Sequence, residues 1–310
     1  MSKINDGIFQ KACLVQLASS SWNGQKMLPN SVMESMGNSD WIKGRKHLIN
    51  PELLAPIKTT IQKARHLLMK TALPFPMQGL FLVPKDSILD VDGHLELIKA
   101  EFWNKVDTFQ DFYAEARDEA KSVLGDLFQE SDYPADIRSK FRLEWRFLLL
   151  DIPSKASILP PEVYAREKDK FRSMMEEAQT MALSALREEF GDIIHSLVDK
   201  LNSPADGKPK AIKSNFMLKL ADFLDSFQDR NIFNDEKLAE LVEQSRSVLK
   251  TMRGGSLGYS LNYNEVLKQK VSTEMATLKD AIDAAIEEMP RRRIRMNDNE
   301  TVPDQLLMAA

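Results

Sequence analysis

The chain has 310 residues, of which 43% are hydrophobic and 28% are charged, and this composition is typical of a folded protein rather than a disordered one. The formal net charge of −4 weighs against a nucleic-acid-binding module, because such modules are usually basic. The single cysteine, Cys13, excludes an internal disulfide and a cysteine-based zinc site.

The N-terminal sequence shows no apolar segment behind a basic start, so we expect no signal peptide. No stretch reaches the roughly 18 consecutive apolar residues that a transmembrane helix needs. The sequence therefore predicts a cytoplasmic protein with no membrane contact.

Residues 1–90 are the least regular part of the chain and are interpreted as a mixed N-terminal region. The apolar run from Ala12 to Ala18 is either a strand or a buried helical turn, because its length suits both. Asn50, followed by a proline, has the pattern of a helix start, and apolar residues then recur at helical spacing. Leu80 to Val83 is the best strand candidate, since a glycine and a proline bound it.

Two similar phrases also fall in this region. One reads Trp22-Asn-Gly-Gln-Lys and the other reads Trp41-Ile-Lys-Gly-Arg-Lys, so each sets a tryptophan beside a glycine and one or two cations. They are either a weak repeat or a coincidence. In a functional interpretation the tryptophans contact a partner or stack on bases; in a structural one they are buried beside lysines whose charged ends reach solvent.

Residues 91–202 carry two long apolar stripes with three- and four-residue steps. The first, from Leu95 to Phe128, predicts a helix of about 35 residues, or roughly 50 Å at 1.5 Å per residue. The second predicts a helix of similar length from Tyr164 to Leu201. The similar lengths, and a shorter helical element between them, predict that the two pack as a long antiparallel hairpin.

Two details belong to this hairpin. Asp92 is expected to cap the first long helix. The shorter element is expected to be a helix that starts at Ala135 and turns Phe141 and Trp145 inward.

Residues 203–210 hold two prolines and a glycine and are expected to form a linker. Three more amphipathic helices are predicted at 212–230, 235–252 and 267–289, and the last has nearly heptad spacing of its apolar residues. We expect them to form a C-terminal helical bundle over residues 211–289, with the last two side by side.

The residues from 290 to 310 are expected to be a basic, disordered tail. The predicted fold is thus mostly α: an elongated helical bundle with a long antiparallel helical hairpin and a short β element near the N-terminus.

One pair of residues has the spacing of a metal site. Asp192 and His195 lie three residues apart on the second long helix, one turn after Glu188 and Glu189. A di-iron helical bundle uses such pairs, but it needs a second pair and two further carboxylates, which the sequence lacks. A structural or surface role for His195 is therefore favoured.

No other pattern points to catalysis. The remaining histidines have no partner at metal-ligand spacing, and the serines at 19–21 lack the glycine elbow of a hydrolase nucleophile. The glycine-rich segment 254–258 lacks the lysine of a phosphate-binding loop. We therefore expect no enzyme, no cofactor and no metal.

Candidate contact residues for a partner or nucleic acid are Trp22 and Trp41, together with an arginine cluster in the tail. The cluster consists of Arg291, Arg292, Arg293 and Arg295. Three roles are open for these arginines: they bind phosphate groups, they contact an acidic partner, or they remain solvated.

Several short phrases, spread over most of the chain, carry a family resemblance. They are Leu14-Val-Gln-Leu with Trp22-Asn-Gly-Gln-Lys, Phe81-Leu-Val-Pro84, Tyr133-Pro134 with Phe141, Ile232-Phe-Asn-Asp-Glu236 and Arg291-Arg-Arg-Ile294. Together they resemble a family of uncharacterised helical proteins of phages, conjugative elements and genomic islands. Its members are often encoded beside a CobS- or MoxR-like AAA+ ATPase and a CobT-like von Willebrand factor A protein.

The resemblance implies a non-catalytic adaptor, substrate or scaffold of such an ATPase system, with those two proteins as partners. Two alternatives stay open. Long helices of neighbouring copies would pack together in a self-assembling structural protein or homo-oligomer. The arginine cluster would bind nucleic acid, although the bulk charge makes this function less expected.

Overall fold

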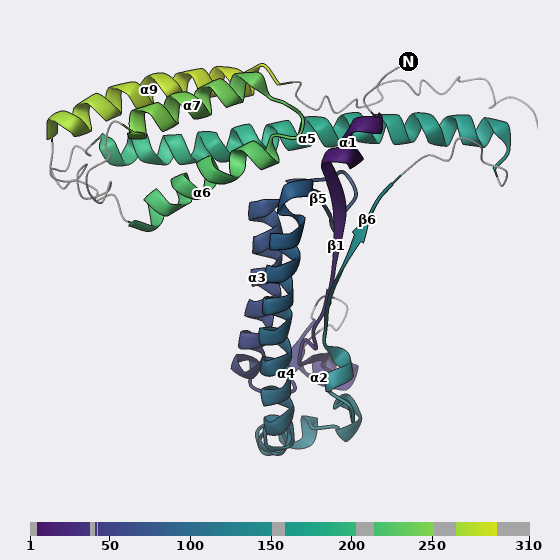
Figure 1. Cartoon of the computed structure of the whole chain (residues 1–310). Coiled ribbons are helices and arrows are strands. Elements are labelled where there is room, and N and C mark those ends of the chain that lie inside the picture. Colours follow the sequence, from purple (N-terminus) through teal and green to yellow (C-terminus); the bar gives the residue numbers. More distant parts are fainter. Residues whose placement is uncertain are drawn as a thin grey trace, which may run out of the picture.

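The computed structural model describes residues 5–37, 41, 43–150, 159–202, 214–250 and 265–289. The protein is mostly helical and has two parts (Figure 1). One part, the arm, holds a pair of helices and a small antiparallel sheet. The other, the helical group, consists of α5, α6, α7 and α9 and lies across one end of the arm.

The sheet is centred on β1 (Ala12–Ser20) and has the strand order β4-β5-β1-β6. On one side of β1 lies β5 (Leu80–Pro84), and the short β4 (Leu73–Pro74) lies beyond β5. The predicted strand at Leu80 is thus confirmed, and the apolar run after Lys11 is a strand rather than a helical turn. All pairings are antiparallel.

On the other side of β1 lies β6 (Arg142–Leu148), where the sequence predicted a helix. That prediction is wrong, and strand is not confined to the first 90 residues. Phe141 and Leu143 are buried while Arg142 and Glu144 are exposed, so the burial alternates with a period of two. The segment pairs with β1, and this pairing satisfies the backbone groups on one side of the strand.

Two helices form the long axis of the arm. The Asn50 side chain accepts a hydrogen bond of 3.0 Å from the Glu52 amide and caps the short 3-10 helix η1 (Pro51–Leu54), which leads into α3 (Ala55–Thr71). The second helix, α4 (Ile88–Leu124), follows the turn η2 (Lys85–Ser87).

The predicted cap at Asp92 is wrong, because α4 begins at Ile88 and contains that residue. The Asp92 carboxylate instead accepts a hydrogen bond of 2.8 Å from the Trp145 indole Nε1 and fixes β6 to α4.

Smaller elements complete the arm. They are α2 (Asn30–Met36), β2 (Gln25–Met27), β3 (Arg45–His47), η3 (Gly125–Leu127), η4 (Glu130–Asp132) and η5 (Arg138–Lys140). The first helix, α1 (Asn5–Lys11), instead reaches the helical group, where the Lys11 ammonium donates to the Ile232 carbonyl at 3.2 Å.

The helical group contains α5 (Pro161–Leu201), α6 (Ser214–Arg230), α7 (Glu236–Lys250) and α9 (Glu265–Glu287). Its helices start and end close to the bounds predicted from the sequence. The α7 and α9 helices lie side by side and run in opposite directions, since Lys237 pairs with Glu288 while Val248 lies near Glu274. The expected linker 203–210 and tail 290–310 lie outside the described residues.

The two long helices do not form the predicted hairpin. Helix α4 packs along α3, whereas α5 packs along α9 and runs in a different direction from α4 (Figure 1). Similar length does not choose a packing partner. The apolar stripe of α4 is covered by α3 and the sheet, and Gly191 of α5 allows α9 to come close.

Buried side chains of the described residues form one cluster in the arm and another in the helical group, and β1 contributes to both. Val15 is fully buried in the arm cluster, and its neighbour Leu14 is fully buried on the opposite face under α5. The alternating sides of one strand therefore join the two parts.

Candidate interaction surfaces

The two tryptophan phrases meet in a small antiparallel ribbon in the arm, away from the helical group (Figure 1). In the ribbon, β2 pairs with β3 so that Lys26 lies opposite Lys46. Two more backbone hydrogen bonds extend the ribbon: the Leu28 amide donates to the Gly44 carbonyl at 3.0 Å, and the Leu48 amide donates to the Gly24 carbonyl at 2.8 Å. The phrases are thus neighbours in space.

The inner face of the ribbon is fixed to the arm by a buried cation. The Lys46 ammonium lies 2.7 Å from a carboxylate oxygen of Asp132 and donates to the Leu127 carbonyl at 2.5 Å. Both side chains of this ion pair are nearly fully buried. The Tyr133 hydroxyl adds a hydrogen bond of 2.8 Å to the Leu48 carbonyl. Lys46 therefore has a structural role.

Trp22 also points into the arm. Its ring lies edge-on to Tyr113, with centroids 5.8 Å apart, and 6.4 Å from Phe109. The Tyr113 hydroxyl donates to the Pro134 carbonyl at 3.1 Å, and burial raises the pKa of this tyrosine to about 12. The Trp22 ring is thus occupied by packing within the chain.

Trp41 differs, because 89% of its surface is exposed. A few residues later in the chain, Arg45 and His47 are exposed and alternate with the buried Lys46, so they form the outer side of β3. Within the described part of the chain, neither Lys43 nor Arg45 forms an ion pair. We call this surface the ribbon face; its residues are Met27, Trp41, Lys43, Arg45 and His47.

The sequence pattern singled out Trp41 with the cations of its phrase, which include Lys43 and Arg45, but not His47 or the common exposed side of these residues. The signal was present, since Lys43, Arg45 and His47 alternate with other residues just before a buried leucine and isoleucine. The four tail arginines lie outside the described residues.

Of the carboxylate and histidine pair on α5, Asp192 is exposed and His195 contacts another helix. The His195 Nε2 atom lies 2.8 Å from a carboxylate oxygen of Asp283 on α9, which also accepts from Lys279 at 3.0 Å. Glu189 instead accepts from Arg230 at 2.6 Å. No group of three or more metal-ligating side chains occurs among the described residues.

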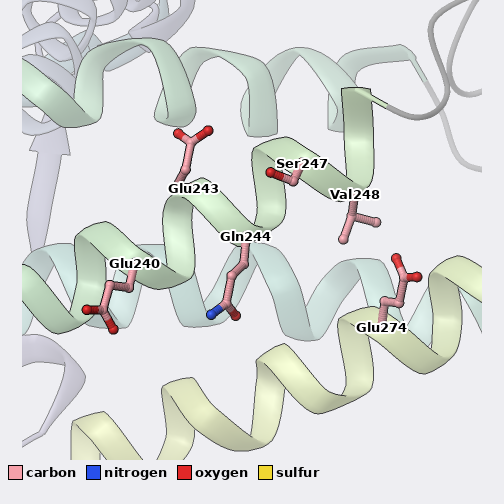
Figure 2. Close-up of a pocket in the computed structure, with 6 residues that line it drawn as sticks. All are labelled: Glu240, Glu243, Gln244, Ser247, Val248 and Glu274. Carbon is pink, nitrogen blue, oxygen red and sulfur yellow. The ribbon is translucent and has the colours of Figure 1, made fainter.

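An acidic groove runs between α7 and α9 (Figure 2). It has a volume of about 620 Å³ and is lined by Glu240, Glu243, Gln244, Ser247, Val248 and Glu274. In Figure 2, Val248 and Glu274 point toward each other across the groove. Carboxylates suit cationic groups, but glutamates are common on exposed helix faces, so this groove could not be predicted from the sequence.

A second cavity, of about 580 Å³, lies where α3 of the arm meets α6. Two ion pairs line it: Lys70 with Asp222 at 2.5 Å, and Arg230 with Glu189 at 2.6 Å. The Lys70–Asp222 pair links α3 of the arm to α6, whereas the Arg230–Glu189 pair links α6 to α5 within the helical group. In addition, none of the described helices is long and apolar enough to cross a membrane.

Comparison with known protein families shows which of these surfaces lie in a region that matches a family. A family model described as a protein of unknown function, DUF3150, matches residues 9–190, which is more than half of the chain. The chain belongs to the DUF3150 family. No curated protein and no solved structure matches it. The DUF3150 match includes the sheet, the ribbon face and most of α5, while the acidic groove lies beyond it.

Proposed function

We propose that this DUF3150 protein is a non-catalytic interaction protein: an adaptor, substrate or scaffold of an AAA+ ATPase system of a phage or mobile element. Its partners in this proposal are a MoxR- or CobS-like AAA+ ATPase and a von Willebrand factor A-type protein. The choice of partners comes from the family resemblance of the sequence phrases.

The ribbon face is the observation that carries the interaction role. The Trp41 indole is exposed over 89% of its surface and so packs little against the described residues, and tryptophan and arginine are among the residues enriched at binding hot spots. Lys43 and Arg45 give the surface a positive charge, so an acidic partner surface fits it. The ribbon is held rigidly from behind by the buried Lys46–Asp132 pair, and rigid presentation lowers the entropic cost of binding.

The test uses the full chain with the purified ATPase and von Willebrand factor A-type protein encoded next to its gene. We expect one of them to bind and the Trp41→Ala variant to bind about tenfold or more weakly. Met69→Ala is the matched control, because Met69 is also an exposed apolar side chain, at 67%, but lies on α3. Binding that is equal in all three proteins would remove the ribbon face from the interaction, and no binding by the wild type would reject this ATPase partnership.

Nucleic acid is the alternative occupant of a basic surface with an aromatic side chain. Titration with single-stranded DNA and RNA at two salt concentrations separates the two functions. Salt-sensitive binding that Trp41→Ala weakens would favour nucleic acid over a protein partner.

A further inference from the structure

The β6 strand is an open edge of the sheet. It pairs with β1 on one side, and in the part of the chain that the structure describes no strand pairs with its other side. A free edge presents unpaired backbone N–H and C=O groups to any strand that can approach. Natural edges are usually protected by charged side chains, and β6 carries three: Arg142, Glu144 and Arg146.

These charges are arranged so that they do not protect the edge against a second copy of the same strand. When two β6 strands run antiparallel around Trp145, each Glu144 lies opposite Arg146 of the other copy. Glu144 is already paired with Arg142 of its own strand, and in this register Arg146 of the other copy adds a second cation on each side of the axis. Leu143 lies opposite Phe147, and Trp145 lies opposite its own copy. Opposite residues of an antiparallel pair share one face of the sheet, so each pair is in reach.

Shifting the two strands removes this match. An axis at Glu144 sets the two Glu144 carboxylates against each other and Arg142 against Arg146. An axis at Arg146 sets the two Arg146 side chains against each other. Like charges directly opposite destabilise a strand pair. The register centred on Trp145 is also the one that pairs all of β6, because Trp145 is its middle residue.

We propose that the protein forms a symmetric homodimer in which the β6 strands of two copies pair antiparallel around Trp145. A two-fold axis places the same surface on both copies, as most soluble homodimers do. The two sheets become continuous, and the two helical groups lie at opposite ends of the dimer. This dimer is independent of the ATPase partnership and leaves both ribbon faces in place.

Exposed apolar side chains at the end of β6 also support a second copy of the chain as the partner of this edge. Phe147 is 38% exposed and Leu149, just beyond the strand, is 69% exposed. In the dimer the exposed surface of Phe147 is covered by the second β6 strand, whereas Leu143, which lies opposite it, is already buried within its own copy. A pair of short strands forms a small interface, so we expect the dimer to be weak, with a dissociation constant in the micromolar range.

Charge reversal tests the register directly. Sedimentation velocity of the full chain over a range of concentrations measures the dimer dissociation constant. Glu144→Arg leaves arginines opposite arginines, and Arg146→Glu leaves glutamates opposite glutamates. Each single variant should raise the dissociation constant about tenfold or more. An equimolar mixture of the two variants should form a heterodimer, because each strand then meets the opposite charge.

Glu119→Arg is the matched control, since it makes the same charge change at an exposed position of α4. It should dimerise like the wild type, and circular dichroism should show that all variants are folded. A monomeric wild type at all concentrations would overturn the proposal. So would a dimer that the single reversals do not weaken, or a mixture of the two variants that stays monomeric.

Discussion

Arg187 is only 8% exposed, and its buried guanidinium forms several hydrogen bonds within the protein. It donates to both carboxylate oxygens of Asp235, at 2.6 and 2.9 Å, and to the Ala285 carbonyl at 2.5 Å. One side chain of α5 thereby joins the start of α7 to the end of α9. Burial alone would raise the pKa of Asp235, but hydrogen bonds from Arg187 and the Leu238 amide outweigh it and hold the pKa below its ordinary value.

Asp235→Asn should therefore destabilise the protein by about 3–5 kcal/mol, because it leaves the buried Arg187 charge without its counter-charge. Urea unfolding at neutral pH measures the loss. Asp283→Asn is the control: Asp283 is also paired, with His195 and Lys279, but its side chain is 37% exposed, so the expected loss is under about 1 kcal/mol. Equal losses of unfolding free energy in the two variants would show that the buried Arg187–Asp235 pair stabilises the protein no more than the exposed pairs of Asp283.

The same carboxylate sets a pH dependence. Its pKa is lower in the folded protein than in the unfolded chain, so its stabilisation is fully present above the ordinary aspartate value of 3.8. The stabilisation is lost as the pH falls below that value toward the folded-state pKa. Wild type should lose stability over this acid range, and Asp235→Asn should lose less. Parallel pH profiles of unfolding free energy would contradict this assignment.

Ser245 is the opposite case. It is fully buried in α7, and among the described residues its hydroxyl has no hydrogen-bond partner. Ser245→Ala removes an unsatisfied polar group and adds a better helix former, so the free energy of unfolding should rise by about 1 kcal/mol. Ser184→Ala, where the hydroxyl donates to Glu188 at 2.7 Å, is the comparison and should give a smaller gain or a loss. A destabilised Ser245→Ala would mean that the hydroxyl has a partner in solution.

Residue environments were hard to predict where the local sequence is repeated. Trp22 and Trp41 stand in similar phrases, yet one packs on Phe109 and Tyr113 and the other is exposed. The difference arises from the pairing of β2 with β3 and from the helix behind the ribbon. Neither contact is encoded within a few residues of the tryptophans.

At the scale of elements, periodicity predicted the helices well and their partners poorly. A continuous stripe of apolar residues at helical spacing predicts a helix, so α5 and α9 were predicted close to their observed bounds. The β6 strand was missed because its alternation spans only a few residues and begins next to a 3-10 turn. Helix pairing depends on where small residues allow close approach, and stripe length carries no such information.

Gly191 marks that close approach between α5 and α9. A Cβ atom there would lie 3.2 Å from Ile286 Cδ1 and 3.3 Å from Ile282 Cγ2. Gly191→Leu should destabilise the protein by about 1–3 kcal/mol, because the added atoms have no space. At Gly93 of α4 a Cβ atom would meet nothing within 4 Å, so Gly93→Leu should be neutral or stabilising. Thermal unfolding of both variants measures the contrast, and similar melting temperatures would show that the two helices can separate slightly.

At the scale of the molecule, the arm and the helical group have separate clusters of buried side chains but share a strand. Leu14 and Val15 are adjacent in β1 and lie in different clusters. The Lys70–Asp222 pair adds a link between α3 and α6. If one part unfolds, β1 loses the cover on one face, and the other part loses the support of that strand. The sequence left the run from Ala12 to Ala18 open between a strand and a buried helical turn, so it did not show that the two faces of this segment belong to different clusters.

The tryptophans allow this coupling to be measured, because all four lie in the arm and none in the helical group. Phe223 of α6 is 2% exposed and stacks on Phe190 of α5, with ring centroids 5.2 Å apart. Phe223→Ala should cost about 3–5 kcal/mol. Because β1 belongs to both clusters, the tryptophan fluorescence of the arm should unfold at the same lowered urea concentration as the far-ultraviolet circular dichroism of the whole chain.

Phe102→Ala, in the arm cluster, is the reciprocal variant and should also shift both signals together. Fluorescence that keeps its wild-type midpoint in Phe223→Ala, while the dichroism shifts, would show that the arm is stable by itself. In that case the contacts on the Leu14 face of β1 would add little to the stability of the arm, and the two parts would fold as independent units.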